Sequence, residues 1–257
     1  WGVGLGGGLG LWDFPVSNID FNKITQDLAI LKSEAQLSGF YRGSSGGLGY
    51  HVIFKDNGSF DIYTVNTLKP AVWDYDGTQW LFRSLDINTQ TFLQNVVLPV
   101  GCSPIFLEDT VWVEGAVNGR ATLASAKLPD IPNSNTNIII PNNITYFSSN
   151  SVLGLIAQKD ILIPLISPNN LEIAAALLAQ KGHVFRGYYP KYNYEPYLTY
   201  AIRDKIQTKG SIITNSMWTF TWVNGSGQFV SGYKETDMAY DASLTFNPPP
   251  YFPASGE

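Results

Sequence analysis

The stretch Ile156-Ala157-Gln158-Lys159 is repeated 22 residues later as Leu178-Ala179-Gln180-Lys181. A period of about 20–50 residues is typical of repeat proteins, in which each repeat buries its apolar face against its neighbours. The residues around both copies are mostly strand-like, and the interval is too short to hold two helices. The repeat therefore predicts stacked coils of a β-solenoid.

Strand-like segments continue on both sides of the repeat. Apolar, β-branched runs punctuated by Gly, Asn and Pro predict further short strands, at residues 111–113, 121–124, 137–140, 143–146, 153–163 and 205–214. Residues 171–179 are also expected to form a strand, although their Ala and Leu content suits a short helix as well. Residues 210–215 look like a third, looser copy, displaced by a Tyr-rich insertion at residues 186–200. In a parallel stack, Asn and Ser side chains at the corners would form ladders.

One helix and two hairpins are expected before the solenoid. Residues 19–37 carry apolar side chains at helical spacing, and Asp20 can act as the N-cap. Turn signals at residues 56–58 and 76–77 separate strand-like segments on either side, which predicts two antiparallel hairpins. Residues 86–108 are interpreted as a connector.

These elements predict a mainly β fold, with a parallel β-helix in the C-terminal half preceded by one helix and a small antiparallel hairpin region. The chain divides accordingly into a Gly-rich segment at residues 1–18, a helix and hairpin part at residues 19–108, and a solenoid at residues 109–257. The Pro-rich end of the chain is expected to cap the last coil.

The composition limits the classes of function. The 257 residues carry a net charge of −5, and no basic run provides a nucleic-acid footprint. Charged residues make up only 14 %, which suits an exported protein or one whose surface is covered in an assembly. A single cysteine, Cys102, rules out an intrachain disulfide. Sequons at Asn57, Asn143 and Asn224 leave glycosylation open.

Several motifs in the second half of the chain occur in a familiar order, at residues 108–117, 121–126, 154–158, 175–180, 210–213 and 247–253. In this order they resemble bacterial surface proteins described as pilus-assembly, PilX-like. The resemblance is clearest over residues 108–253. In that family a hydrophobic N-terminal helix precedes a region expected to be an extracellular β-solenoid. The resemblance implies export and a structural or adhesive role, and it brings no catalytic residue. This chain lacks the hydrophobic helix, so membrane contact would occur only through a removed or missing helix.

The N-terminal segment is the strongest candidate for assembly contacts. Residues 1–12 combine large apolar side chains with glycines, a composition that can pack closely against another backbone. Such a segment could insert into a neighbouring copy by strand addition or groove filling. The predicted contact residues are Trp1, Val3, Leu5, Leu9, Leu11 and Trp12.

The sequence argues against an enzyme, a metal site and a cofactor. The acidic residues are few and scattered, whereas the polysaccharide lyases and hydrolases built on β-helices need clustered carboxylates. His51 and His183 lack a second ligand at zinc spacing. A Ser-His-Asp triad nevertheless stays open, because its members meet only in the fold.

Three functions follow from these observations. The leading hypothesis is an extracellular, self-assembling structural protein, such as a filament, pilus-like or surface-layer subunit whose main partner is itself. The second is a carbohydrate-binding adhesin that stacks sugars on its aromatic residues. The third is a β-helix polysaccharide lyase or hydrolase. Trp218, Phe220 and Trp222 are further stacking candidates, and the expected glycan contacts are Tyr188, Tyr189, Tyr192 and Tyr194.

Overall fold

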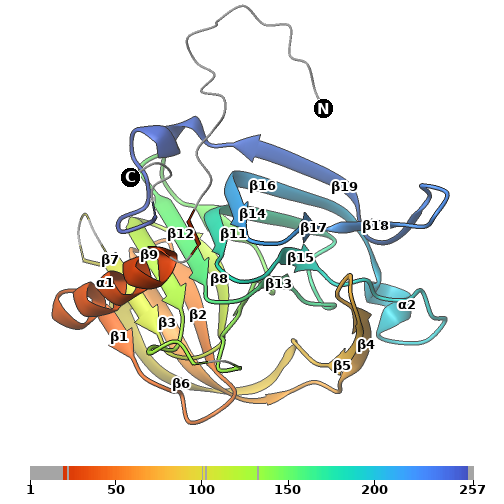
Figure 1. Cartoon of the computed structure of the whole chain (residues 1–257), viewed down its shortest axis with the longest axis horizontal. Helices are drawn as coiled ribbons and strands as arrows, with labels where there is room; N and C mark the ends of the chain where they lie inside the picture. Colours follow the sequence, from red (N-terminus) through yellow and green to blue (C-terminus); the bar gives the residue numbers. More distant parts are fainter. Residues whose placement is uncertain (1–19, 22, 100, 102, 132, 254–257) are drawn as a thin grey trace, which may run out of the picture.

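Parallel strands stack into a three-faced solenoid with one helix across its first face (Figure 1). The computed structural model describes residues 20–21, 23–99, 101, 103–131 and 133–253. The mainly β architecture and the parallel β-helix predicted from the sequence are confirmed. None of the helices within the described residues is long and apolar enough to span a membrane.

Each face is a column of strands paired in parallel register. The first face consists of β1 (Phe40–Arg42), β7 (Ser103–Leu107), β9 (Arg120–Ser125), β12 (Val152–Ala157) and the second halves of β14 (Asn170–Ala179) and β16 (Ile202–Thr214). The second face consists of β2 (Tyr50–Lys55), β8 (Val111–Val117), β10 (Ile138–Ile139), β13 (Ile161–Ile163), β15 (Val184–Arg186) and β17 (Trp218–Thr219).

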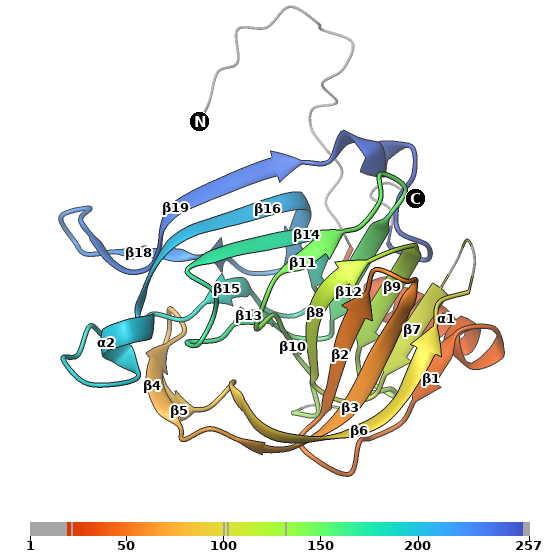
Figure 2. The same cartoon turned by 180° about the vertical axis from the view of Figure 1, so that it is seen from behind.

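The third face carries the long strands of the last coils (Figure 2). It consists of the end of β8, β11 (Ile144–Tyr146), the first halves of β14 and β16, and β19 (Phe229–Tyr240). The exposed side of this face bears ion pairs, such as Lys205 with Glu235 at 3.0 Å. Such solvated pairs contribute little to stability.

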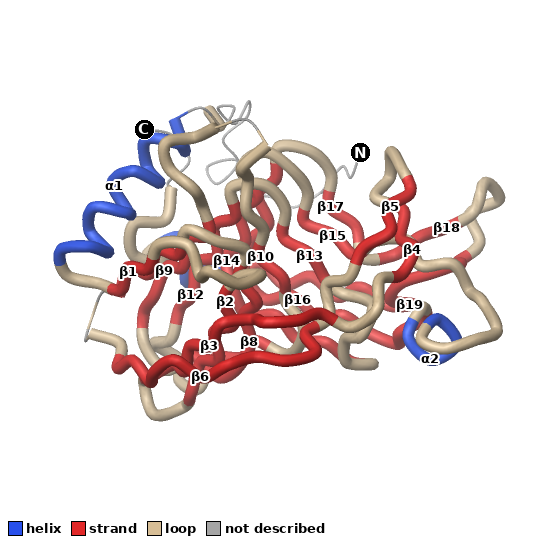
Figure 3. Tube along the Cα trace, turned by 90° about the horizontal axis from the view of Figure 1, so that it is seen from below, coloured by secondary structure: helices blue, strands red, loops and turns tan. Residues whose placement is uncertain are grey.

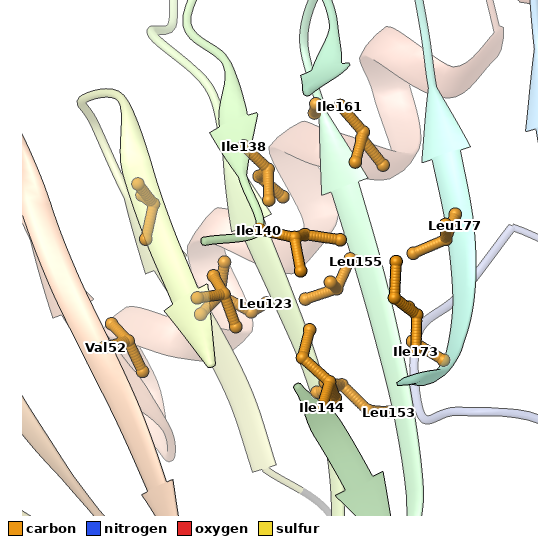
Figure 4. Packing of buried hydrophobic residues seen from close by; sticks show 14 of the residues in the cluster. Val52, Leu123, Ile138, Ile140, Ile144, Leu153, Leu155, Ile161, Ile173 and Leu177 are labelled. Carbon is orange, nitrogen blue, oxygen red and sulfur yellow. The ribbon is translucent and has the colours of Figure 1, made fainter. Parts of the chain in front are cut away.

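The sequence repeat lies in register on the first face. Ile156 pairs with Leu178, and Leu178 pairs with Ile213, so residues 210–215 are a third copy as predicted. Residues 171–179 lie within strand β14, not a helix. Aliphatic side chains point into the interior of the solenoid and pack against one another, so they are almost completely buried (Figure 4). Burying each such side chain contributes about 1.5–3 kcal/mol.

Helix α1 (Lys23–Leu37) covers the first face from outside. Its buried stripe of Ile24, Leu28, Leu31 and Ala35 packs on outward side chains of successive coils, including Phe106, Ile156 and Leu178. The C-terminal segment crosses the same face, where the Oγ1 of Thr122 donates a hydrogen bond to Pro250 O. It thus contacts β9 and also lines a pocket with Ser211 and Ile213 of β16, so it lies against several coils and not against the last one alone.

The two predicted hairpins are confirmed, and the predicted connector is wrong. β2 pairs antiparallel with β3 (Ser59–Leu68), and β4 (Val72–Tyr75) pairs with β5 (Trp80–Arg83) as a separate two-stranded sheet. Residues 86–108 contain β6 (Ile87–Val97), which pairs with β3, and β7, which belongs to the solenoid. β6 is mostly polar and exposed, so it lacks the apolar alternation that marks a strand.

The remaining elements are short. Helix α2 (Tyr197–Tyr200) lies in the Tyr-rich insertion, β18 (Thr221–Val223) pairs antiparallel with β19, and a 3-10 turn spans Ala242–Thr245. Figure 3 shows that α2 and the β4–β5 hairpin lie at the end of the molecule far from α1. The sites described below are built on that end.

Candidate functional site

The β4–β5 hairpin presents four aromatic side chains on one face. Trp73 is paired across the hairpin with Phe82, and Tyr75 with Trp80. Their ring centroids lie 5.2 and 5.5 Å apart. Because side chains alternate along a strand, all four project from the same side. Trp73, Trp80 and Phe82 are 48, 50 and 62 % exposed, which is unusual for side chains of this size.

The opposite side of the hairpin is anchored by a buried ion pair. Asp74 is almost fully buried and accepts hydrogen bonds from Arg83, with Nη2 2.7 Å from Oδ2. Burial raises the pKa of Asp74, and the Arg83 guanidinium opposes that shift only in part. Tyr197 accepts a hydrogen bond from the backbone N–H of Trp73 and donates one to its carbonyl oxygen at 3.1 Å. The aromatic face is therefore held in a fixed orientation.

Two aromatic residues from the last coils extend this face. Trp80 contacts Tyr188 at 5.8 Å between ring centroids, and Tyr188 contacts Trp222 at 6.1 Å. Trp222 also contacts Tyr75 at 6.1 Å, which closes a ring of four aromatic residues. We call the resulting set the aromatic surface; its members are Trp73, Tyr75, Trp80, Phe82, Tyr188 and Trp222.

The structure divides the four predicted glycan contacts. Tyr188 is half-buried and belongs to the aromatic surface. Tyr189 is only 2 % exposed, so it packs in the interior and is corrected from a ligand contact to a core residue. Tyr192 and Tyr194 are 42 and 58 % exposed and stack in parallel at 5.2 Å. Tyr197 lies edge-on against both.

A buried arginine supports the insertion that carries these tyrosines. Arg186 donates hydrogen bonds to the carbonyl oxygens of Leu165 and Tyr200, at 3.1 and 2.7 Å. Its guanidinium lies 5.1 Å from the ring centre of Tyr189 and 5.5 Å from that of Tyr233. Burial lowers the pKa of Arg186. The arginine therefore positions the insertion from inside the molecule.

Sequence reasoning missed the hairpin half of the aromatic surface. The signal was available, because the alternation of Trp73 with Tyr75 and of Trp80 with Phe82 places them on one face of a hairpin that the turn signals predict. Of the other predicted stacking residues, Phe220 is buried at 1 %, while Trp218 lies at the open end of the solenoid.

Within the part of the chain that the structure describes, the C-terminal end of the solenoid is open. Apolar side chains of the last coils line a groove there, and Trp218, Met238 and Tyr240 are 46, 43 and 66 % exposed. Its floor contains Leu177 and Ile212. The opposite end is closed by the β2–β3 hairpin, whose Phe54, Phe60 and Ile62 are buried. The predicted assembly residues Trp1, Val3, Leu5, Leu9, Leu11 and Trp12 lie outside the described residues.

The described residues contain no group of three His, Cys, Asp or Glu side chains that could hold a metal ion. His51 is buried between β3 and β8, with Nδ1 2.7 Å from Gln90 Oε1 and Nε2 2.8 Å from Glu114 Oε1. Those bonds satisfy both ring nitrogens within the sheet. His183 lies at a corner of the solenoid, between Asp160 and Ser216.

Comparison of the chain with protein-family models, with curated proteins and with solved structures found no match.

Proposed function

We propose that the protein is an extracellular carbohydrate-binding protein whose ligand stacks on the aromatic surface. The observation that carries this proposal is the row of exposed rings on one face of a braced hairpin. The apolar C–H faces of sugar rings pack well on flat aromatic side chains. Rigid Trp and Tyr side chains give large contact areas at low entropic cost.

The surroundings of the aromatic surface also suit a neutral, hydroxyl-rich ligand. The charges of Asp74 and Arg83 neutralise each other on the far side of the hairpin. Exposed Thr78 and Gln79 precede Trp80 in the hairpin turn and supply hydrogen-bonding groups beside the rings. The exposed tyrosine pair, Tyr192 and Tyr194, joins the hairpin through Tyr197, which suggests room for several sugar units. The low content of charged residues, 14 %, supports the extracellular setting.

A glycan array followed by titration of intrinsic tryptophan fluorescence with the best polysaccharide tests the proposal. Trp80→Ala and Trp73→Ala should each weaken binding at least about tenfold, as expected for a central aromatic contact. Trp218→Ala is the matched control, because Trp218 is similarly exposed at 46 % but lies at the open end. An array without a hit, or equal affinity of Trp80→Ala and the unchanged chain, would refute the proposal.

A second function, self-assembly into a filament or surface layer, is favoured by the open end. Its apolar groove is left uncovered by the described residues of the chain. We infer that residues 1–12 of a second copy occupy it. In that segment Trp1, Val3, Leu5, Leu9 and Leu11 all fall on odd positions, with glycine between them. Such alternation favours a strand with one apolar side, as strand addition requires.

The described residues begin on the first face, within the last coils. The Nε2 of Gln180 donates a hydrogen bond to the carbonyl oxygen of Phe21 at 3.3 Å, beside the end of β14. Deleting residues 1–12 should abolish polymers seen by electron microscopy and sedimentation, while circular dichroism shows an intact fold. Trp218→Glu should have the same effect, and Trp80→Ala should have none. Polymers that persist after the deletion would refute this mode of assembly.

A further inference from the structure

A column of polar side chains runs along the corner before the second face. Asn137, Asp160 and His183 occupy equivalent places in successive coils, since each carbonyl oxygen accepts the hydrogen bond of a second-face strand. The Oδ1 of Asn137 accepts a hydrogen bond from Asp160 N at 3.1 Å, and the Oδ1 of Asp160 accepts one from His183 N at 2.8 Å. A polar ladder therefore runs along this corner, but after Asn137 it is built from Asp160 and His183 and not from the expected Asn and Ser side chains.

The chemistry of the ladder changes in the last coils. The Nδ1 of His183 lies 3.1 Å from Asp160 Oδ1, and its Nε2 lies 2.9 Å from the Oγ of Ser216. A ladder that only caps backbone N–H groups needs amide or carboxylate oxygens, not an imidazole followed by a hydroxyl. The order carboxylate, imidazole, hydroxyl is that of a nucleophilic triad, which is recognised by geometry rather than by sequence position.

The exposure of the three side chains also suits those roles. Asp160 is buried, with 6 % of its side chain exposed, while 21 % of the His183 side chain is exposed and Ser216 lies at the surface. A buried carboxylate that fixes the imidazole tautomer and an accessible hydroxyl are the arrangement that nucleophilic catalysis requires.

The local backbone fixes this geometry. A Cβ on Gly182 would overlap Asp160 Oδ1, so only glycine at position 182 allows the carboxylate to occupy this position. The carbonyl oxygen of Gly182 accepts hydrogen bonds from Ser216 N at 3.2 Å and from Thr214 Oγ1 at 2.6 Å. The ring of Phe185 lies edge-on to His183 at 5.2 Å. Preorganisation of this kind is what an active site needs.

We propose that Ser216, His183 and Asp160 form a catalytic triad that hydrolyses carboxylic esters. The Oγ of Ser216 bonds to the ester carbonyl carbon while its proton passes to Nε2 of His183. The bond from that carbon to the alkoxy oxygen then breaks, and Nε2 returns the proton to the departing alcohol. A water molecule then gives a proton to Nε2 of His183 and bonds to the acyl carbon. The bond from that carbon to the Oγ of Ser216 breaks, and Nε2 returns the proton to Oγ, which releases the carboxylic acid and restores the hydroxyl.

The geometry favours esters over amides. Because the N–H of Ser216 is bonded to the carbonyl oxygen of Gly182, it is not free to stabilise an oxyanion. Losing one such donor costs about 10²–10³-fold in rate. With the rate lowered in this way, hydrolysis of the less reactive amides would be too slow to matter. We therefore expect slow turnover of esters with good leaving groups.

The position of the triad suggests what carries the ester. Met217 follows Ser216 directly, and a Cβ on Gly77 in the β4–β5 turn would lie 2.5 Å from the Cε of Met217. The triad therefore neighbours the aromatic surface. An acyl group esterified to a glycan bound there is the expected natural substrate. This last step alone rests on the proposed carbohydrate function; the triad chemistry does not.

The test measures hydrolysis of 4-nitrophenyl acetate by the full chain over many turnovers, which excludes single acylation of surface lysines. Ser216→Ala should lower the turnover to the background rate, because removal of the nucleophile costs an established triad up to roughly 10⁶-fold in kcat. Ser226→Ala is the matched control, because Ser226 is an exposed serine in the β18–β19 turn, and it should keep full activity. A fluorophosphonate probe should label Ser216, as located by peptide mass spectrometry.

The outcomes separate a triad from a ladder. Turnover equal in the unchanged chain and in Ser216→Ala, or a probe attached elsewhere, would overturn the proposal and leave the column a purely structural ladder. Hydrolysis of 4-nitrophenyl acetate involves no sugar, so this assay reports on the triad whether or not the chain binds a glycan. Failure of glycan binding and failure of the esterase are therefore distinguishable.

Discussion

Asp86 carries a charge that the fold disfavours, and its replacement should stabilise the protein. The side chain precedes β6, is 9 % exposed, and accepts a hydrogen bond from the backbone N–H of Ile166 at 3.3 Å. Burial raises the pKa of Asp86 to about 6. That hydrogen bond and the charges of Lys69 and Arg186 oppose the shift without cancelling it.

The shift sets the size and the pH range of the effect. The pKa of Asp86 rises from an ordinary 3.8 to about 6, and each unit corresponds to 1.36 kcal/mol, so the ionised form costs about 3 kcal/mol. The folded chain binds the proton of Asp86 more tightly than the unfolded chain does. Protonation of Asp86 therefore stabilises the fold, and this contribution is complete below pH 3.8. It is lost as the pH rises to about 6. Asp86→Asn is neutral throughout and keeps an oxygen for the N–H group.

We therefore expect Asp86→Asn to raise the free energy of unfolding by up to about 3 kcal/mol above pH 7, and by almost nothing near pH 4. Urea denaturation followed by tryptophan fluorescence, at several values of pH from 4 to 8, measures this difference. A difference independent of pH, or a loss of stability at pH 7, would refute the reasoning.

Asp76→Asn provides a control of opposite sign. Burial raises the pKa of Asp76, but hydrogen bonds from Thr78 and Gln79 outweigh it and lower the pKa overall. The ionised carboxylate is thus favoured in the fold, and its contribution is lost as the pH falls through the lowered pKa. The Asn variant should be less stable than the unchanged chain at pH 7, and the two should converge on acidification.

Two further substitutions test the packing of the last coils. Gly210 has a φ of +153°, and a Cβ there would overlap the carbonyl oxygen of Ala175, so Gly210→Ala should lose at least about 2 kcal/mol of unfolding free energy in urea. Gly225→Ala meets nothing within 4 Å and should change it by less than about 0.5 kcal/mol; equal effects would contradict the close approach. Arg186→Lys removes the planar hydrogen-bonding group, so the free energy of unfolding should fall by about 3 kcal/mol or more, and limited proteolysis should cut residues 188–200 faster; unchanged resistance would contradict the anchoring role.

The solenoid was predictable because its signal is local and repeated. The copies at residues 156–159 and 178–181 stack in register, since identical positions in a coil face identical surroundings. The turn signals likewise identify both hairpins. β6 was not predicted because its own sequence is mostly polar and has no apolar alternation. It forms a strand because it pairs with β3, and such long-range pairing is not visible in sequence periodicity.

The candidate sites were less accessible to sequence reasoning because they depend on register between coils. Ser216 and His183 are 33 residues apart along the chain, and only the stacking of β15 beside β17 brings them together. Trp80 and Tyr188 likewise meet because the hairpin packs on the last coils. The aromatic inventory was visible in the sequence, but which rings are buried, as Tyr189 is, depends on the tertiary packing.

The three proposed activities can be separated although their residues are close together. Trp80 lies on the outward face of a hairpin, Trp218 in the groove at the open end, and Ser216 on the corner, two residues before Trp218. Substituting any one of them should remove glycan binding, polymerisation or ester hydrolysis respectively and spare the other two. A single substitution that removed all three would instead indicate that the last coils unfold locally, because neighbouring sites with independent chemistry fail together only when their shared scaffold does.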